Sequence, residues 1–292
     1  ERKMSAGNFG TIDYQAVPSV AMTRYRSAFG RHDFARFDAY INAVTKGVAK
    51  INASTSYPYD LIMPYINGAR WSHVISADKA LEAQWRALPN YVEGNHNVIV
   101  MSDVSGSMFC EGNRPIATSV ALGIYFAERN TGAYKNLFLT FTDQPKFYEL
   151  NPNEPVCDRV SRVMRHVGYN TNLDGAFDAI FKTARSAGEG PEALAIISDG
   201  EIDRFRSYHD VDSIVDKWAR TYATAGLKAP KLIMWNVESR GSRYIDKNVD
   251  NGKVCYISGS SASSFKELNT LITKNAVEAM IEILTKPQFS WK

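Results

Sequence analysis

The feature that most constrains the fold is an alternation of short apolar segments with longer helical segments, which begins at about Asn95. We expect strands at residues 97–102, 137–141, 146–149, 193–198, 231–237 and 254–258. We expect helices at residues 116–128, 156–167, 173–187, 211–225 and 263–284. Strands that alternate with helices indicate βαβ units and a mostly parallel sheet. Parallel strands are covered on both faces, which explains why residues 193–198 (ALAIIS) lack polar alternation. The pattern predicts a doubly wound, mostly parallel α/β domain over residues 96–292.

Residues 1–95 have a different pattern, since they lack long β-branched runs and are rich in Tyr, Phe, Arg and Ala. A helix is expected at 33–46, where apolar residues recur every three or four positions and form one face. Shorter helices are expected at 19–29, ending at Gly30, and at 76–88, starting near Asp78. The prolines at 58 and 64 predict extended linkers between them. This part is therefore interpreted as a small helical region.

Composition excludes several classes of protein. The chain has 292 residues, of which 45% are hydrophobic and 22% charged, which excludes a disordered or collagen-like chain. Its three cysteines are far apart and form no CxxC motif, so we expect a reducing, cytoplasmic location. No apolar run approaches the length of a membrane span. The chain does not begin with Met, which is compatible with a piece of a longer protein.

Oxygen-bearing side chains follow the predicted strands. In open α/β sheets, ligands bind outside the carboxyl ends of the strands. Asp103, Ser105 and Ser107 follow the first strand, Thr171 precedes a helix, and Asp199 follows the strand at 193–198. Carboxylates and hydroxyls without His or Cys favour a hard divalent cation, Mg²⁺ or alternatively Mn²⁺.

Each of these pieces also has a purely structural interpretation. Asp and Ser often cap the helix that follows a strand, and Thr171 alone is typical of an N-cap for the helix at 173–187. The Asp199-Gly200 pair is a common turn sequence. What favours a metal site is the order of the three segments and their position after buried strands.

Residues 103–108 (DVSGSM) resemble the opening of the metal-ion-dependent adhesion site of von Willebrand factor A domains. The resemblance implies that Asp103, Ser105, Ser107 and Thr171 hold Mg²⁺ and that Asp199 acts through water. It further implies a non-enzymatic module in which an Asp or Glu of a protein partner completes the coordination.

The N-terminal region has a narrower resemblance, carried by residues 21–26 (AMTRYR), 28–29 (AF), 36–40 (RFDAY) and 57–60 (YPYD). These segments are similar to a family found in plants, large viruses and phages, whose layout resembles the Ro autoantigen. In Ro-type proteins a helical-repeat ring precedes the A domain and binds RNA. Only about 95 residues precede the A-like domain here, which is far short of a ring, so the resemblance implies that residues 1–95 are the remnant of a helical-repeat scaffold. The resemblance to phage and viral proteins leaves a virion role open.

An RNA-binding role is the alternative function. Residues 1–95 hold 11 Lys and Arg against 8 Asp and Glu, so the whole positive excess of the chain lies there. The candidate RNA contacts are Arg24, Arg26, Arg31 and Arg36, which lie among aromatic residues. Because the excess is only +3, a solvated helix face is the favoured interpretation of these arginines.

An enzyme is not expected. The five histidines show no HExxH spacing, and the chain has neither a GxSxG elbow nor a phosphate-binding loop. A Mg²⁺-dependent phosphoryl transferase would need a base beside the ion, for which only Glu201 and Asp174 are spare carboxylates.

Overall fold

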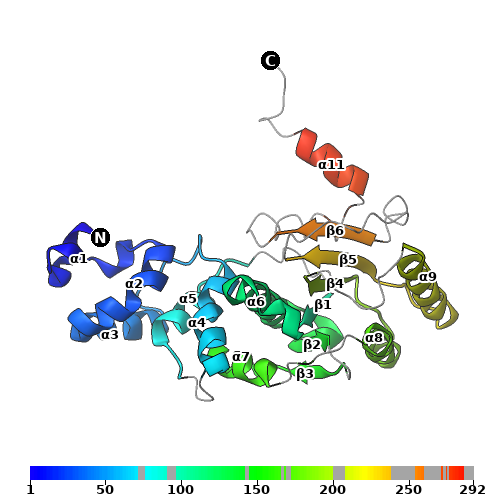
Figure 1. Cartoon of the computed structure of the whole chain (residues 1–292), viewed down its shortest axis with the longest axis horizontal. Coiled ribbons are helices and arrows are strands. Elements are labelled where there is room, and N and C mark those ends of the chain that lie inside the picture. The colour runs from blue at the N-terminus through cyan, green and yellow to red at the C-terminus, as the bar shows by residue number, and fades with distance from the viewer. Residues whose placement is uncertain are drawn as a thin grey trace. The chain divides into compact units, whose positions relative to one another are not determined.

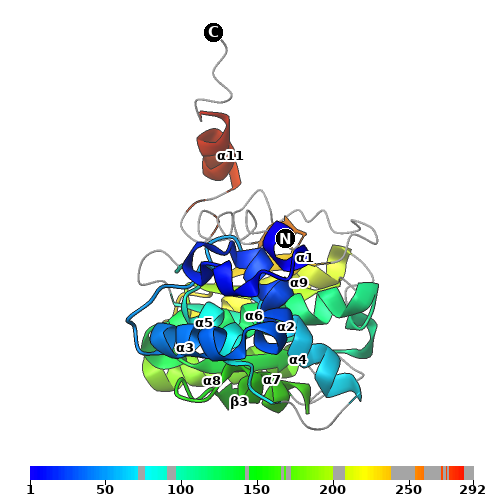
Figure 2. The ribbon, with the colours of Figure 1, turned by 90° about the vertical axis from the view of Figure 1, so that its left-hand side faces the viewer.

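The computed structural model divides into two compact units, coloured by residue number in Figures 1 and 2. A helical unit comprises Glu1–Pro89 and Asn153–Ser161, and a sheet unit comprises Asn90–Pro152 and Arg162–Lys292. The structure describes residues 1–71, 76–90, 97–141, 145–165, 168, 172–199, 208–237, 254–259, 271, 274 and 276–285.

The sheet unit contains a six-stranded sheet in the order β3-β2-β1-β4-β5-β6. Its strands are β1 (Val98–Asp103), β2 (Leu137–Phe141), β3 (Phe147–Glu149), β4 (Ala193–Ser198), β5 (Lys231–Asn236) and β6 (Val254–Ser258). All neighbouring pairs are parallel except β2 and β3, which are antiparallel. The predicted mostly parallel α/β fold is confirmed, and β1 and β4 lie at its centre.

Figure 1 shows helices α6 (Arg114–Arg129), α8 (Leu173–Ala187) and α9 (Tyr208–Thr224) beside the sheet. Helix α11 (Ala276–Leu284) also belongs to the sheet unit, whereas α7 (Val156–Met164) begins in the helical unit. Short 3₁₀ turns lie at η3 (Gly106–Met108), η4 (Glu111–Asn113) and η5 (Gly132–Tyr134). The helix predicted at 156–167 ends at Met164, while the predicted residues 263–270 of the last helix lie outside the described part of the chain. Among the residues described, no helix combines the length and apolarity needed to cross a bilayer.

Both faces of the sheet are buried. One face packs its alternate residues, such as Met101 and Ile196, against α8 and α9, where the rings of Phe177 and Trp218 stack 3.9 Å apart. The other face lies against α6, where Ser102 Oγ donates a 2.9 Å hydrogen bond to the Ser119 carbonyl. This double coverage explains why β1 and β4 are buried along their whole length.

The helical unit is built from α1 (Arg2–Ser5), η1 (Phe9–Thr11), η2 (Tyr14–Ala16), α2 (Ser19–His32), α3 (Phe34–Thr45), α4 (Pro58–Trp71) and α5 (Lys79–Arg86). Helices α2, α3 and α5 pack against one another around an aromatic cluster that includes Tyr14, Phe29 and Phe37. The predicted start of α5 is confirmed, because the Asp78 side chain accepts hydrogen bonds from the Ala80 and Leu81 backbone N–H groups.

Two sequence predictions for this unit are wrong. Residues 58–64 form the first half of α4 and are not an extended linker. Pro58 begins the helix, where its missing N–H costs nothing, and Pro64 is tolerated inside it because Leu61, Ile62 and Ile66 are fully buried. Helix α2 also continues through Gly30 to His32, since glycine lowers helix stability by only about 1 kcal/mol.

Residues 153–161 join the helical unit through Glu82. Its buried carboxylate accepts hydrogen bonds from the backbone N–H groups of Val156 (2.7 Å) and Cys157 (3.2 Å). These N–H groups belong to the first turn of α7, which has no intrahelical partners for them. A side chain distant in sequence therefore supplies the N-terminal cap of α7.

We predict that two glycine-to-alanine changes shift stability in opposite directions. A Cβ at Gly123 of α6 would overlap the Phe138 ring and Ser102 Oγ, so Gly123→Ala should lower the free energy of unfolding by about 1–3 kcal/mol. A Cβ at Gly30 of α2 meets nothing, so Gly30→Ala should raise it by about 0.5–1 kcal/mol. Urea unfolding of the two variants beside the parent measures both shifts, and equal stabilisation by both would contradict the close packing of α6 on the sheet.

Candidate metal site

Asp103 ends β1 with its side chain completely buried. Its Oδ1 accepts the backbone N–H of Ser105 (2.8 Å), and its Oδ2 accepts the hydroxyl of Ser198 (2.7 Å). Burial raises the pKa of the Asp103 carboxyl, and the nearby charge of Asp199 also raises it, while the hydrogen bonds from Ser105 and Ser198 act in the opposite direction. The centre of the site is thus a buried carboxylate that forms none of the described salt bridges.

The hydroxyls of the two predicted serines lie close together beside Asp103. Ser105 precedes the 3₁₀ turn η3, and the Asp103 carboxylate holds the backbone at this point through the Ser105 N–H. The hydroxyl oxygens of Ser105 and Ser107 lie 3.1 Å apart. Ser105 is buried and Ser107 is exposed, so the hydroxyl pair extends from the buried carboxylate toward solvent.

Asp199 reaches the same place from the neighbouring strand. It directly follows β4, is 8% exposed, and lies beside Asp103 closely enough for its charge to affect that carboxyl. Ser198, the last residue of β4, lies between the two, with its hydroxyl 3.4 Å from Asp199 Oδ1 and 2.7 Å from Asp103 Oδ2. The carboxyl ends of β1 and β4 are therefore joined by polar side chains.

Thr171 lies outside the described residues, but both ends of its loop are described. Gly168, three positions earlier, forms a parallel bridge with Ser105. Asn172, the next residue, is the N-cap of α8, and its Oδ1 accepts the Gly175 N–H at 3.0 Å. The interpretation of Thr171 as the N-cap of this helix is wrong, because Asn172 occupies that position.

The donor set fits a small, hard cation. Asp103 accepts from the Ser105 backbone N–H and from the hydroxyls of Ser105 and Ser198, and a carboxylate offers about four lone pairs, so some acceptor capacity is left for a ligand. The surrounding groups are carboxylate and hydroxyl oxygens, which suit Mg²⁺ or Mn²⁺. In the part of the chain that is described, no three His, Cys, Asp or Glu residues group into a metal site, so a cation here needs the serine hydroxyls.

Sequence reasoning missed Ser198. In the sequence it is simply the last residue of an apolar strand. In the structure its hydroxyl donates a hydrogen bond to Asp103, which lies 95 positions earlier. Its position immediately before Asp199 is the signal that could have identified it.

The predicted RNA-contacting arginines divide into two pairs. The Arg26 Nε lies 2.6 Å from Asp78, and Arg36 binds Asp33 together with the carbonyls of Phe9 and Ile12, so both hold the helical unit together. Arg24 and Arg31 are exposed on α2.

Of the two carboxylates considered for catalysis, the structure describes only that of Asp174. Asp174 lies in the first turn of α8 at 3.8 Å from Lys217 Nζ. Glu201 lies outside the described residues.

Known proteins resemble this chain in sequence and in fold. The uncharacterized protein L728 of Acanthamoeba polyphaga mimivirus is 26% identical over 97% of this chain and 51% of that protein, so the chain spans about half the length of this curated relative. The crystal structure of the Deinococcus radiodurans Ro (RSR) protein superposes with a TM-score of 0.55 at 17% identity, over 88% of this chain and 53% of that one. The expected Ro-like fold and viral relative are both confirmed.

Two family matches follow the same division of the chain. Residues 1–95 match the family described as Domain of unknown function (DUF2828). Residues 97–284 match the family described as Domain of unknown function (DUF7788). Because this second match covers more than half of the sequence, the chain belongs to the DUF7788 family.

Proposed function

We propose that the chain is a non-enzymatic binding module whose sheet unit captures an acidic residue of a protein partner through a bound Mg²⁺. Asp103, Ser105, Ser107 and Thr171 would hold the ion, with Asp199 acting through water. The observation that carries the proposal is the fully buried Asp103 carboxylate, which faces two converging hydroxyls and a second carboxylate. When bound, the ion supplies the positive charge that this group of oxygens requires.

Neutral hydroxyls are what make the site suitable for capturing an acid. A serine hydroxyl contributes an oxygen ligand without a negative charge, so a cation held largely by hydroxyls keeps much of its charge. Ser107 lies on the solvent side of Asp103, which is where an outside carboxylate would approach. The buried Asp103 supplies affinity for the ion, and the exposed side supplies the position for the partner.

The one candidate base among the described residues is already engaged, which supports binding rather than catalysis. The Asp174 carboxylate, at the start of α8, is paired with Lys217 of α9. The thiol of the buried Cys157, whose pKa burial raises to about 12, is also a poor nucleophile. The helical unit would serve as a docking platform for the partner or as part of a larger scaffold.

We predict that Asp103→Asn abolishes the stabilisation of the chain by Mg²⁺. Without metal, the variant should melt at the same temperature as the parent or higher, because the charged carboxylate no longer has to be buried. At ten times the dissociation constant, Mg²⁺ should stabilise the parent by about 1.4 kcal/mol, or about 2–4 °C, and leave the variant unchanged. Thermal melts and calorimetric titrations in EDTA and in Mg²⁺ measure both effects.

A matched control is Asp178→Asn, which removes the same charge from an exposed position of α8. It should keep the full stabilisation by Mg²⁺. Equal Mg²⁺ affinity in Asp103→Asn and the parent would refute the site.

Capture of a carboxylate can be tested with acetate as the probe. With Mn²⁺ in place of Mg²⁺, acetate that enters the coordination sphere should show enhanced relaxation of its methyl protons in proportion to the protein. Asp103→Asn should abolish the enhancement, and Asp178→Asn should retain it. Enhancement that is equal in all three proteins would mean that acetate meets only free Mn²⁺.

The fold likeness to a Ro protein over 88% of the chain favours RNA binding as a second candidate function. Arg24 and Arg31 are the exposed arginines of α2 that would contact phosphates. If both do, the double variant Arg24→Gln/Arg31→Gln should reduce the slope of log affinity against log salt by about 1.4, at about 0.7 per contact on a single strand. Gel shifts across a salt series measure this slope. Lys182→Gln/Arg185→Gln on α8 is the control of equal charge, and no binding by the parent at low salt eliminates this function.

A further inference from the structure

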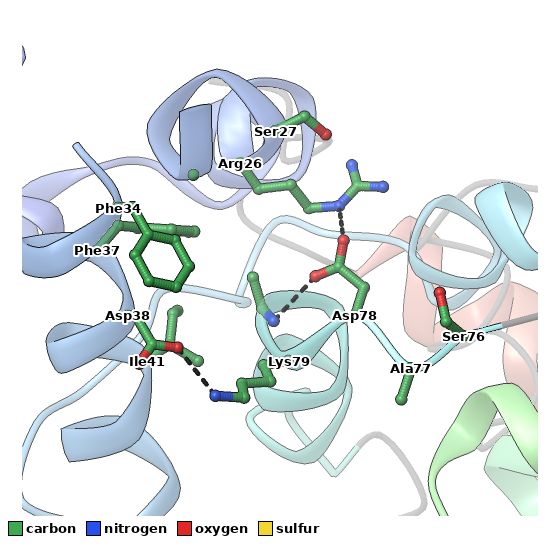
Figure 3. Close-up of a pocket in the computed structure, with 12 residues that line it drawn as sticks. Arg26, Ser27, Phe34, Phe37, Asp38, Ile41, Ser76, Ala77, Asp78 and Lys79 are labelled. Atoms are coloured by element: carbon green, nitrogen blue, oxygen red, sulfur yellow. Dashed lines mark hydrogen bonds and ion pairs between the residues drawn. The ribbon is translucent and has the colours of Figure 1, made fainter. Parts of the chain in front are cut away.

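A cavity of about 290 Å³ lies within the helical unit, between α2, α3 and the start of α5. Figure 3 shows the ring of Phe34 on one side, Asp38 and Lys79 below, and Arg26 with Asp78 opposite. Phe34 is 68% exposed, and it is the one aromatic residue among the exposed large hydrophobic residues that the structure describes. An aromatic ring left open to a cavity is a stacking surface for a planar ligand.

The charges around the cavity are balanced. Arg26 pairs with Asp78 at 2.6 Å, and Lys79 pairs with Asp38 at 2.9 Å. A phosphate would face two carboxylates, and a divalent cation would face an ammonium and a guanidinium. The cavity therefore favours a ligand whose bound part is uncharged and carries hydrogen-bond donors and acceptors next to each other.

The two carboxylates differ in how much acceptor capacity they retain. Asp78 accepts from Arg26 Nε and from two backbone N–H groups at the start of α5, so it is committed to the fold. Asp38 accepts from Lys79 Nζ and from Asn42 Nδ2, which leaves about two of its four lone-pair positions. The hydrogen bond from Lys79 lowers the pKa of Asp38, so its carboxylate stays ionised at neutral pH.

Phe34 and Asp38 are placed to act on one ligand. They lie four positions apart on α3 and therefore share a helix face, and Lys79 reaches the same point from α5. The Lys79 side chain is 64% exposed, so its ion pair with Asp38 is a weak surface contact that can reorganise around a ligand. The cavity thus offers a stacking surface, a double acceptor and a flexible donor.

We infer that this cavity binds a guanine base, which stacks on Phe34, donates from N1–H and N2–H₂ to Asp38 and accepts at O6 from Lys79. Guanine carries two neighbouring donors beside an acceptor, and unstacked bases are commonly recognised by aromatic stacking and by their hydrogen-bonding edges. The cavity volume is close to the lower limit of ligand sites, which suits one base or nucleoside. The site is independent of the proposed metal site, because all of its residues belong to the helical unit.

The test is titration of the full chain with guanosine in EDTA, followed by NMR or calorimetry. Guanosine should bind saturably at millimolar concentration or below and more tightly than adenosine or cytidine. Phe34→Ala should weaken binding by about 5- to 150-fold, the range measured for loss of one stacked base. Asp38→Asn should lower guanosine affinity to that of adenosine. Val48→Ala, which truncates another exposed apolar side chain outside the cavity, should leave binding unchanged.

Two further ligands distinguish the source of the base. If a pentamer AAGAA of RNA binds at least tenfold more tightly than guanosine monophosphate, and Phe34→Ala removes the difference, the base belongs to a strand. If the two bind equally and Phe34→Ala weakens both, the ligand is a free nucleotide. No saturable guanosine binding, or binding that is unaffected by Phe34→Ala, overturns the inference.

Discussion

The hydrogen bond from Ser198 to Asp103 ties together the carboxyl ends of the two central strands, β1 and β4. At this point Asp103 is fully buried and Asp199 nearly so. Burying a carboxylate without a compensating charge is costly, and hydroxyl and N–H donors offset only part of that cost. Burial raises the pKa of the Asp103 carboxyl, and the charge of Asp199 raises it further. The proposed cation would offset this cost, so the proposed metal site and the local energetics of the sheet would have the same origin.

Much of the sheet could be predicted from the sequence because each strand is a contiguous apolar run. Residues 193–198 contain no charged side chain and could be buried on both faces, which only a covered sheet provides. The helical unit was harder, because its structure depends on contacts between distant residues. Pro64 argues locally against a helix, yet burial of Leu61, Ile62 and Ile66 on its flanks outweighs the lost hydrogen bond. Tertiary packing of this kind leaves no periodic signal at the proline itself.

The candidate site could be predicted as far as it follows strand order. Asp103, Ser105 and Asp199 stand directly after strands that the apolar pattern identifies, so their proximity follows from parallel pairing alone. Side-chain direction does not follow in the same way. Nothing in the sequence distinguishes Arg26, which pairs with an aspartate 52 positions away, from Arg24, which is exposed. The sequence therefore predicts one surface of four arginines, although two of them, Arg26 and Arg36, hold the helical unit together.

The two units differ in how they distribute charge, and the ligands proposed for them differ accordingly. The sheet unit gathers two carboxylates with neutral hydroxyls, which is the reason for proposing a cation there. The cavity of the helical unit pairs every carboxylate with a basic side chain, so a charged ligand would have to break an existing pair. An exposed ring then becomes the dominant feature available for binding. Local charge balance, more than the number of charged residues, thus distinguishes the ligands proposed for the two units, and the net charge of +3 for the whole chain indicates neither of them.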